Sequence, residues 1–486
     1  MPPTASYRPD PRHPALGEAF YDAVEAAPFP AEILRFRNDR WAARVGLDGL
    51  TDREWIAHFA RFDPLPDNLT RPLALRYHGH QFRAYNPDLG DGRGFLYAQL
   101  RDDDGRLLDL GTKGSGRTPW SRGGDGRLTL KGGVREVLAT EMLEAQGVYT
   151  SKTFSLVETG EALQRNDEPS PTRSSVLVRL SHGHIRIGTF QRLAAHDQIA
   201  EMRRLVDHCI AFYWPAAAEA ADPVAGLFAH VITAVAETAA DWWVAGFVHG
   251  VLNTDNTAIT GESFDYGPWR FLPTLDPRFT AAYFDHSGLY SFGRQADSLY
   301  WNCERLASCL LELSNEAALT EALRGFEPAF WHRLVHRTCA KLGIASGDEQ
   351  TDEIVRCFYE ALHQTQIGYE RCFFDLVGGA RPERVGASPH RAAYAQDVWA
   401  PVLSALRNAP PTPATAALLD SAPLAADEPC TMLTADVEEI WDRIAEDDDW
   451  APFEAKVRAI RDWGDAYRLL LPVTGPSRHS GGGPAA

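Results

Sequence analysis

The fold of this chain is decided by residues 95–113, which read FLYAQLRDDDGRLLDLGTK. Two apolar runs flank an Asp-Gly step, a pattern that predicts strand, tight turn and strand. We therefore expect a β-hairpin that ends at Lys113. This lysine is informative because the chain has 43 arginines but only five lysines.

Further segments with chemical potential follow the hairpin. After a glycine-rich connection, Val134–Gln146 has apolar residues at helical spacing and carries Glu136 in its first turn. Much later come His249-Gly-Val-Leu-Asn-Thr-Asp-Asn256 and Asp265-Tyr-Gly267. The joint order of these parts is typical of a protein-kinase-like nucleotide site, although no Walker A or G-x-G-x-x-G sequence is present.

Lys113 and Glu136 are candidate parts of a phosphate site. The Lys113 ammonium could neutralise phosphate oxygens while Glu136 on the following helix holds it in place. The alternative is an ordinary ion pair on the surface, and the motifs further along the chain argue against it.

Asn256 and Asp265 have the spacing of the two protein ligands of a kinase magnesium ion, since Mg²⁺ prefers carboxylate and amide oxygens. Turn chemistry is the alternative reading of such a loop. The Asp that accepts a proton in kinases stands two residues after His, and here that position is Val251. Either the protein is a catalytically inactive kinase homologue, or Asp255 takes a different role in proton abstraction or metal binding.

Arg179 and Arg186 suggest an anion site. Residues 176–188 read as a second hairpin with a turn at His182-Gly183, which would make the two arginines cross-strand neighbours. Like charges directly opposite each other are destabilising, so an anion such as phosphate would be expected between them. The alternative is that both side chains point into solvent or pair with acidic residues.

The chain divides by pattern into four predicted parts. We expect an N-terminal helical extension (1–75), an N-lobe with nucleotide-binding loops (76–190), a helical C-lobe with catalytic and metal-binding loops (191–400), and a variable C-terminal region with a disordered tail (401–486). The predicted class is thus α+β, with a small sheet-containing N-lobe and a mainly helical C-lobe. Further expectations are long helices at 198–218, 225–246, 295–313 and 352–376, a short strand at 257–260 and a loose loop at 407–428.

Composition limits the class of partner. The 486 residues include 48 Lys and Arg against 66 Asp and Glu, a net charge of −18, which disfavours binding to nucleic acid or anionic membranes. A local cationic pocket remains compatible with this balance. The absence of an apolar signal core or a long apolar run leads us to expect a cytoplasmic protein. Seven scattered cysteines without a C-x-x-C pair argue against a disulfide framework.

The motifs together resemble the selenoprotein O family. They lie between residues 79 and 295 and comprise GHQF (79–82), LGDGR (89–93), KGSGRTPWSR (113–122), GDGR (124–127), VRE (134–136), HGVLNTDN (249–256) and DYGP (265–268). The resemblance implies a protein-kinase-like fold and a protein adenylyltransferase, which binds ATP in the reverse orientation and transfers AMP to Ser, Thr or Tyr hydroxyls of proteins.

The resemblance also implies residue roles. Lys113 with Glu136 would hold the triphosphate, Arg179 and Arg186 would grip its innermost phosphates, Asn256 and Asp265 would bind Mg²⁺ or Mn²⁺, and Asp255 would accept the proton. The residues implied to contact the nucleotide are Gly90, Gly92, Arg93, Asp125 and Gly126. Two alternatives remain: a pseudokinase scaffold that binds nucleotide, and a true kinase that transfers phosphate.

Overall fold

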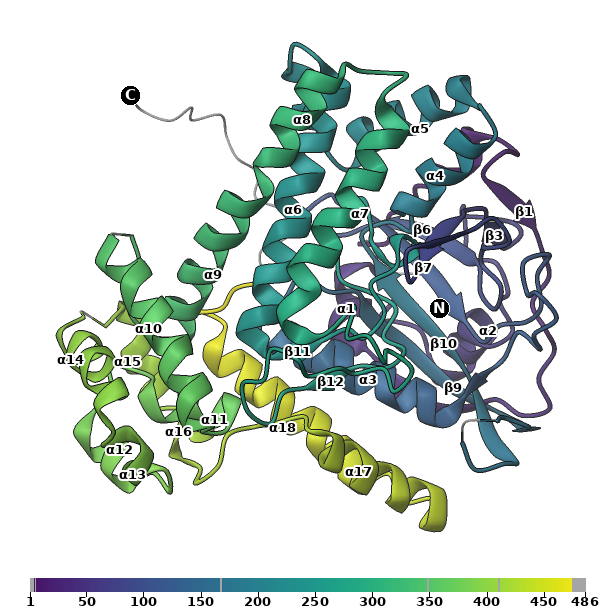
Figure 1. Cartoon of the computed structure of the whole chain (residues 1–486). Coiled ribbons are helices and arrows are strands. Elements are labelled where there is room, and N and C mark those ends of the chain that lie inside the picture. Colours follow the sequence, from purple (N-terminus) through teal and green to yellow (C-terminus); the bar gives the residue numbers. More distant parts are fainter. Residues whose placement is uncertain (1–3, 5, 167, 348, 410, 474–486) are drawn as a thin grey trace.

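The computed structural model describes residues 4, 6–166, 168–347, 349–409 and 411–473. Figure 1 shows the strands of the first half of the chain on one side of the molecule and the helices of the second half on the other. The predicted tail from residue 475 onwards lies outside the described residues.

An eight-stranded antiparallel sheet is the main β structure within the described residues. Its strand order is β1, β3, β6, β7, β10, β9, β2, and β8 pairs with β10. The strands are β1 (Tyr21–Ala23), β2 (Ile33–Arg37), β3 (Leu73–Leu75), β6 (Leu96–Arg101), β7 (Leu107–Lys113), β8 (Leu128–Thr129), β9 (Lys152–Leu163) and β10 (Thr172–Ser181). Two small ribbons pair β4 (Gly79–Gln81) with β5 (Ala84–Asn86), and β11 (Phe247–Val248) with β12 (Arg270–Phe271).

The hairpin expected at 95–113 is confirmed as β6 and β7. Leu100 stands opposite Leu108, and Lys113 is the last residue of β7. The connection is longer than a two-residue Asp-Gly turn, since β6 ends at Arg101 and β7 begins at Leu107. Within it, Asp102 Oδ1 accepts a hydrogen bond from the Arg106 amide at 2.9 Å. Gly105 has φ +77° within this connection, a backbone region that glycine adopts easily.

Helix α3 (Leu130–Ala145) confirms the predicted helix and begins four residues earlier than its apolar pattern indicated. Thr129 caps it by accepting a hydrogen bond from Gly132 N, a role for which threonine is well suited. The helix packs against β9 and β10 on one side and against α18 on another, so its residues are buried around most of its circumference.

The predicted hairpin at 176–188 is wrong. β10 ends at Ser181, and the chain continues into α4, which begins at Ile187. Because β7 and β9 already occupy both edges of β10, no edge is free to pair with residues 184–188. Arg179 and Arg186 are therefore not cross-strand neighbours.

The second half of the chain is mainly helical around α6 (Pro223–Ala245). By length and composition α6 could span a membrane, but 61% of its most apolar window is buried inside the molecule, as in a core helix. Besides short 3-10 helices, the other α-helices of the described residues are α1 (Asp39–Arg44), α2 (Asp52–Phe59), α4 (Ile187–Ala195), α5 (Ile199–Phe212), α7 (Gln295–Leu310), α8 (Glu316–Arg324), α9 (Phe326–Leu342), α10 (Glu349–Thr365), α11 (Tyr369–Leu376), α12 (Pro382–Ala387), α13 (Arg391–Tyr394), α14 (Ala400–Asn408), α15 (Pro413–Leu419), α16 (Ala422–Ala425), α17 (Thr434–Asp447) and α18 (Ala451–Tyr467).

Several local predictions need correction. The first 75 residues are not only helical, since β1, β2 and β3 join the main sheet. The loop expected at 407–428 contains α15 and α16, whose apolar residues such as Leu418 are buried. The helix expected at 352–376 is divided into α10 and α11. Residues 257–260 form no strand, although Ala258 bridges Arg186.

Candidate functional site

Lys113, Glu136 and Asp265 meet in a buried cluster at the end of β7. Lys113 Nζ lies 2.5 Å from Glu136 Oε2 and 2.9 Å from Asp265 Oδ1. Lys113 and Glu136 are 5% and 1% exposed, which excludes the surface ion pair that was the alternative interpretation. Buried charges of this kind are tolerated when opposite charges and hydrogen bonds compensate them.

Asp265 is the carboxylate on which the cations of the site converge. Arg179 Nη1 lies 3.5 Å from Asp265 Oδ1. Burial alone would raise the pKa of Asp265, but nearby positive charges outweigh it and hold the pKa well below its ordinary value; they belong to Lys113, Arg179, Arg93 and Arg186. The Asp265 side chain keeps 28% of its surface exposed, so it remains accessible.

Arg179 and Arg186 do converge, although not through a hairpin. The two guanidinium carbons each lie 5.1 Å from the centre of the Phe264 ring. Arg186 comes from the N-terminal end of α4 and donates to the backbone oxygen of Asp255 at 3.2 Å. Within the described residues, buried Arg179 Nη1 and Arg186 Nε make no hydrogen bond. An anion would satisfy such donors.

The 249–256 segment is held in place by contacts with residues 79–82. The His80 amide donates to Thr254 Oγ1 at 2.7 Å, and the Phe82 amide donates to Asn253 Oδ1 at 3.1 Å. A Cβ at Gly79 would lie only 2.8 Å from Asp255 Oδ1, so glycine lets the two segments approach. The GHQF motif thus positions the loop that carries Asp255.

Asp255 is a buried carboxylate with an unmet hydrogen-bonding capacity. It is 8% exposed, and its Oδ1 has no hydrogen-bond partner within the described residues. Burial raises the pKa of Asp255 to about 6, although the Arg186 charge opposes the shift. A cation or a proton donor beside Asp255 would compensate this carboxylate.

The predicted metal ligands fit a divalent cation in donor type. Asn256 Nδ2 donates to the Val251 oxygen at 3.0 Å, so the amide oxygen is the atom of this side chain that remains to bind a cation. No group of three or more His, Cys, Asp or Glu residues in the described ranges could hold a metal. Two carboxylates and an amide instead match Mg²⁺, which commonly takes its other ligands from substrate phosphates and water.

Gly90 and Gly92 lie where the 89–94 loop packs against Trp120. A Cβ at Gly90 would come within 2.4 Å of Trp120 Cγ, and a Cβ at Gly92 within 2.7 Å of the Trp120 oxygen. The Arg93 oxygen accepts a hydrogen bond from Gly114 N at 2.7 Å, which joins this loop to the residue after Lys113. These glycines therefore have a packing role in addition to any contact with a nucleotide.

Asp125 and Gly126 are less directly connected to the cluster. Asp125 forms an ion pair with Arg165 at 2.8 Å. Gly126 has φ +71°, and a Cβ there would lie 2.2 Å from the Gly116 oxygen. Gly126 thus permits its loop to pack against the loop that follows Lys113, whereas the Asp125 carboxylate pairs away from Lys113.

The structure adds residues that sequence reasoning missed. His184 Nε2 accepts a hydrogen bond from Arg179 Nε at 3.1 Å, and its Nδ1 lies 3.3 Å from the buried carboxylate of Asp109. Asp91 lies 3.3 Å from Arg186 Nη2, and the Tyr77 ring packs 4.3 Å from the Arg186 guanidinium. The LGDGR motif at 89–93 contains Asp91 and could have indicated it, whereas the other contacts depend on tertiary structure.

The buried donors of Lys113, Arg179 and Arg186, from the central strands β7 and β10 and the start of α4, lie near the carboxylates of Asp265 and Asp255. Such a set of charges suits phosphate groups and a cation. The class of protein indicated is a nucleotide-dependent transferase. The family model described as protein adenylyltransferase SelO matches residues 3–461, and the chain belongs to this family. It is therefore a nucleotidyltransferase that uses ATP to adenylylate proteins.

Curated relatives agree with this assignment. A protein nucleotidyltransferase YdiU of Synechocystis is 44% identical over 93% of this chain and 97% of its own length. The protein of the same name from Gloeobacter violaceus is 45% identical over 93% of the chain and 94% of its own length. One from Rhodopseudomonas palustris is 38% identical over 81% of each. The family match thus extends well beyond residues 79–295, where the recognisable motifs lie.

Proposed function

We propose that the protein transfers AMP from ATP to Ser, Thr or Tyr hydroxyls of target proteins and releases pyrophosphate. The observation that carries the proposal is the convergence of Lys113, Arg179 and Arg186 around Asp265, where buried Arg179 Nη1 and Arg186 Nε make no hydrogen bond within the described residues. We further propose that the sheet and the helical region act as the two lobes of a protein-kinase-like fold, with ATP between them.

In this proposal the triphosphate lies against the buried cations. Lys113, oriented by Glu136, neutralises one phosphate, and Arg179 and Arg186 donate to the innermost phosphates. Arg93 contributes positive charge from the 89–94 loop, and the loops at Gly90, Gly92, Asp125 and Gly126 border the nucleotide. A protein with net charge −18 needs such a local concentration of cations to hold a polyanion.

Asn256 and Asp265 would hold Mg²⁺ or Mn²⁺, with Asp255 nearby. A bound divalent cation neutralises phosphate charge and favours departure of the leaving group. Without it, Asp265 pairs with Lys113 and Arg179, as the distances of 2.9 and 3.5 Å indicate. The two aspartates also influence each other, since the Asp265 charge contributes to the raised pKa of Asp255.

The chemical step needs a proton acceptor and a positioned α-phosphate. The hydroxyl oxygen of the target attacks the α-phosphorus, its proton passes to Asp255, and the bond between the α-phosphorus and the bridging oxygen of pyrophosphate breaks. Val251 occupies the position of the usual kinase base and cannot accept a proton. A reversed ATP presents the α-phosphate in place of the γ-phosphate, so catalysis rests on positioning and charge neutralisation.

Labelled ATP tests the proposal directly. The protein is incubated with a target protein and ATP that carries label on either the α- or the γ-phosphate. Label retained from the α position supports AMP transfer, whereas label retained only from the γ position would identify a true kinase. Label retained from neither, together with thermal stabilisation by ATP, would identify a pseudokinase scaffold.

Two variants and a control complete the experiment. Asp255→Asn should abolish transfer while ATP still stabilises the protein, because the phosphate-binding cations remain. Lys113→Met should impair both transfer and ATP binding. Arg278→Ala is a matched control, since this side chain is 95% exposed and lies outside the site.

We also propose a cytoplasmic enzyme whose partners are proteins and ATP, without nucleic acid or membrane.

A further inference from the structure

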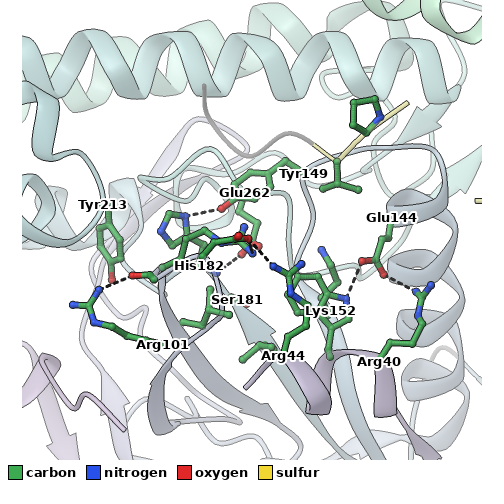
Figure 2. A pocket seen from close by; sticks show the side chains of 18 of the residues that line it. Arg40, Arg44, Arg101, Glu144, Tyr149, Lys152, Ser181, His182, Tyr213 and Glu262 are labelled. Carbon is green, nitrogen blue, oxygen red and sulfur yellow. Dashed lines mark hydrogen bonds and ion pairs between the residues drawn. The ribbon is translucent and has the colours of Figure 1, made fainter. Parts of the chain in front are cut away.

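A cavity of about 1540 Å³ lies apart from the charged cluster. It is bordered by α3, the ends of β9 and β10, the 3-10 helix Pro215–Glu219 and α18. None of Lys113, Glu136, Arg179, Asp255 or Asp265 lines it. Its volume exceeds the roughly 300–1,000 Å³ that is common for small-molecule sites. Figure 2 shows its side chains pointing into the space beneath a long helix.

The lining is cationic in a strongly acidic protein. It contains six arginines and one lysine against five carboxylates. Several arginines are already matched: Arg461 Nε lies 2.7 Å from Glu141, and Arg40 Nη2 lies 3.0 Å from Glu144. Arg468, at the rim, keeps 75% of its side-chain surface exposed and reaches Asp465 only at 4.0 Å.

Lys152 differs from the paired arginines. It is one of five lysines in the chain and is 4% exposed. Within the described residues no carboxylate lies within ion-pair distance of it; its Nζ donates to the Thr150 oxygen and lies 4.9 Å from the Trp41 ring centre. Burial lowers the pKa of Lys152, and the charges of Glu144, Glu262 and Glu141, which lie beyond ion-pair distance, oppose this shift only in part. A negatively charged ligand would compensate such a buried ammonium.

Two further polar groups are incompletely matched in this cavity. The Ser181 hydroxyl is buried and has no hydrogen-bond partner within the described residues. Glu262 accepts a hydrogen bond from the His182 amide at 2.7 Å, and burial raises its pKa to about 7. Near neutral pH the lining therefore carries less negative charge than its composition suggests. Figure 2 places Ser181, Lys152 and Glu262 around the same space.

We propose that this cavity is an effector site for a phosphate-bearing small molecule, separate from the ATP site. Buried Lys152 supplies a charge, the unpartnered Ser181 hydroxyl supplies a donor, and Arg468 adds positive charge at the entrance. Ammonium and guanidinium groups with nearby hydroxyls are the usual protein donors to phosphate. Free pyrophosphate and a nucleotide share this chemistry, so both are candidate sources of the phosphate group.

Two elements connect the cavity to the ATP site. Helix α3 carries Glu141 and Glu144 into the cavity and Glu136 to Lys113. Glu262 lies three residues before Asp265 in the same segment, and Arg179 and Ser181 are two residues apart on β10. A ligand that shifts Lys152 or Glu262 would thus alter the elements that hold Lys113 and Asp265. Such coupling requires that the ligand bind one arrangement of these residues more tightly than the other.

Isothermal titration of the full chain with pyrophosphate, and separately with AMP, tests the proposal in the presence of Mg²⁺. We expect two binding events for at least one probe. Lys152→Met, which keeps the apolar stem, should weaken one event by about tenfold or more, as loss of a charged hydrogen bond does. Arg468→Glu should weaken the same event, and the other event should persist in both variants as an internal measure of folding.

The outcomes separate the sources and the alternatives. A second event with pyrophosphate supports a free polyphosphate-type ligand, and a second event only with AMP supports a nucleotide. A single event with both probes would overturn the proposal. A second event that neither Lys152→Met nor Arg468→Glu weakens would also overturn it. If Lys152→Met does not fold, Arg468→Glu decides, because its side chain is largely exposed.

Discussion

Replacement of Glu262 by glutamine should stabilise the protein above neutral pH. Glu262 is 7% exposed, and burial raises its pKa from 4.5 to about 7 despite the positive charges of Lys152 and Arg106. A shift of this size corresponds to about 3 kcal/mol of unfavourable free energy when the folded-state carboxylate is ionised. Glutamine keeps an oxygen that can accept the hydrogen bond from the His182 amide, and it removes the charge.

The sign of the pH dependence follows from proton binding. Between pH 4.5 and 7 the unfolded state loses the Glu262 proton first, so the folded state holds more protons and wild-type stability falls as pH rises. Above pH 7 the full difference in stability between the Glu262→Gln variant and wild type is present. Glu262→Gln should therefore exceed wild type by about 3 kcal/mol at pH 8 and by less than about 1 kcal/mol at pH 5.

Urea unfolding at both pH values, in a buffer without phosphate, measures this difference. Glu141→Gln is the matched control, because Glu141 is a buried glutamate of the same cavity that receives both Arg461 Nε at 2.7 Å and Nη2 at 2.9 Å. Its replacement should destabilise by about 3 kcal/mol or more, since Arg461 loses its partner. A Glu262→Gln variant no more stable than wild type at pH 8 would refute the reasoning.

Three further predictions concern the proposed ATP site. Lys113→Met should destabilise the fold by about 3–5 kcal/mol in urea unfolding, because Glu136 and Asp265 lose their shared cation; unchanged stability would contradict the buried cluster. Gly92→Ala should cost about 1–3 kcal/mol, since the new Cβ would lie 2.7 Å from the Trp120 oxygen, whereas Gly105→Ala meets no atom within 4 Å and reports only the strain of φ +77°. Chelation of divalent cations with EDTA should abolish AMP transfer, and addition of Mg²⁺ or Mn²⁺ should restore it; transfer that persists in EDTA would exclude a metal role.

Much of the local structure was predictable because it depends on neighbours in the chain. The two apolar runs around the turn at Gly105 predicted the hairpin that ends at Lys113, and helical spacing placed Glu136 on α3. Long-range pairing was not predictable in the same way. The false hairpin at 176–188 had a plausible turn at Gly183, but β7 and β9 occupy both edges of β10. The early strands β1, β2 and β3 are short, and they are strands because they pair with distant ones.

The sequence by itself determined the types of residue available for chemistry, their order, and the family to which the chain belongs. Its motifs indicated the candidate residues, because the spacing within a motif can be read directly from the order of residues. These candidates are Lys113, Glu136, Arg179, Arg186, Asp255, Asn256 and Asp265. Tertiary structure alone decided which charges are compensated. Lys113 lies within ion-pair distance of two carboxylates, whereas no carboxylate of the described residues lies within that distance of Lys152, since ion pairing and desolvation depend on neighbours in space and on the water that burial removes.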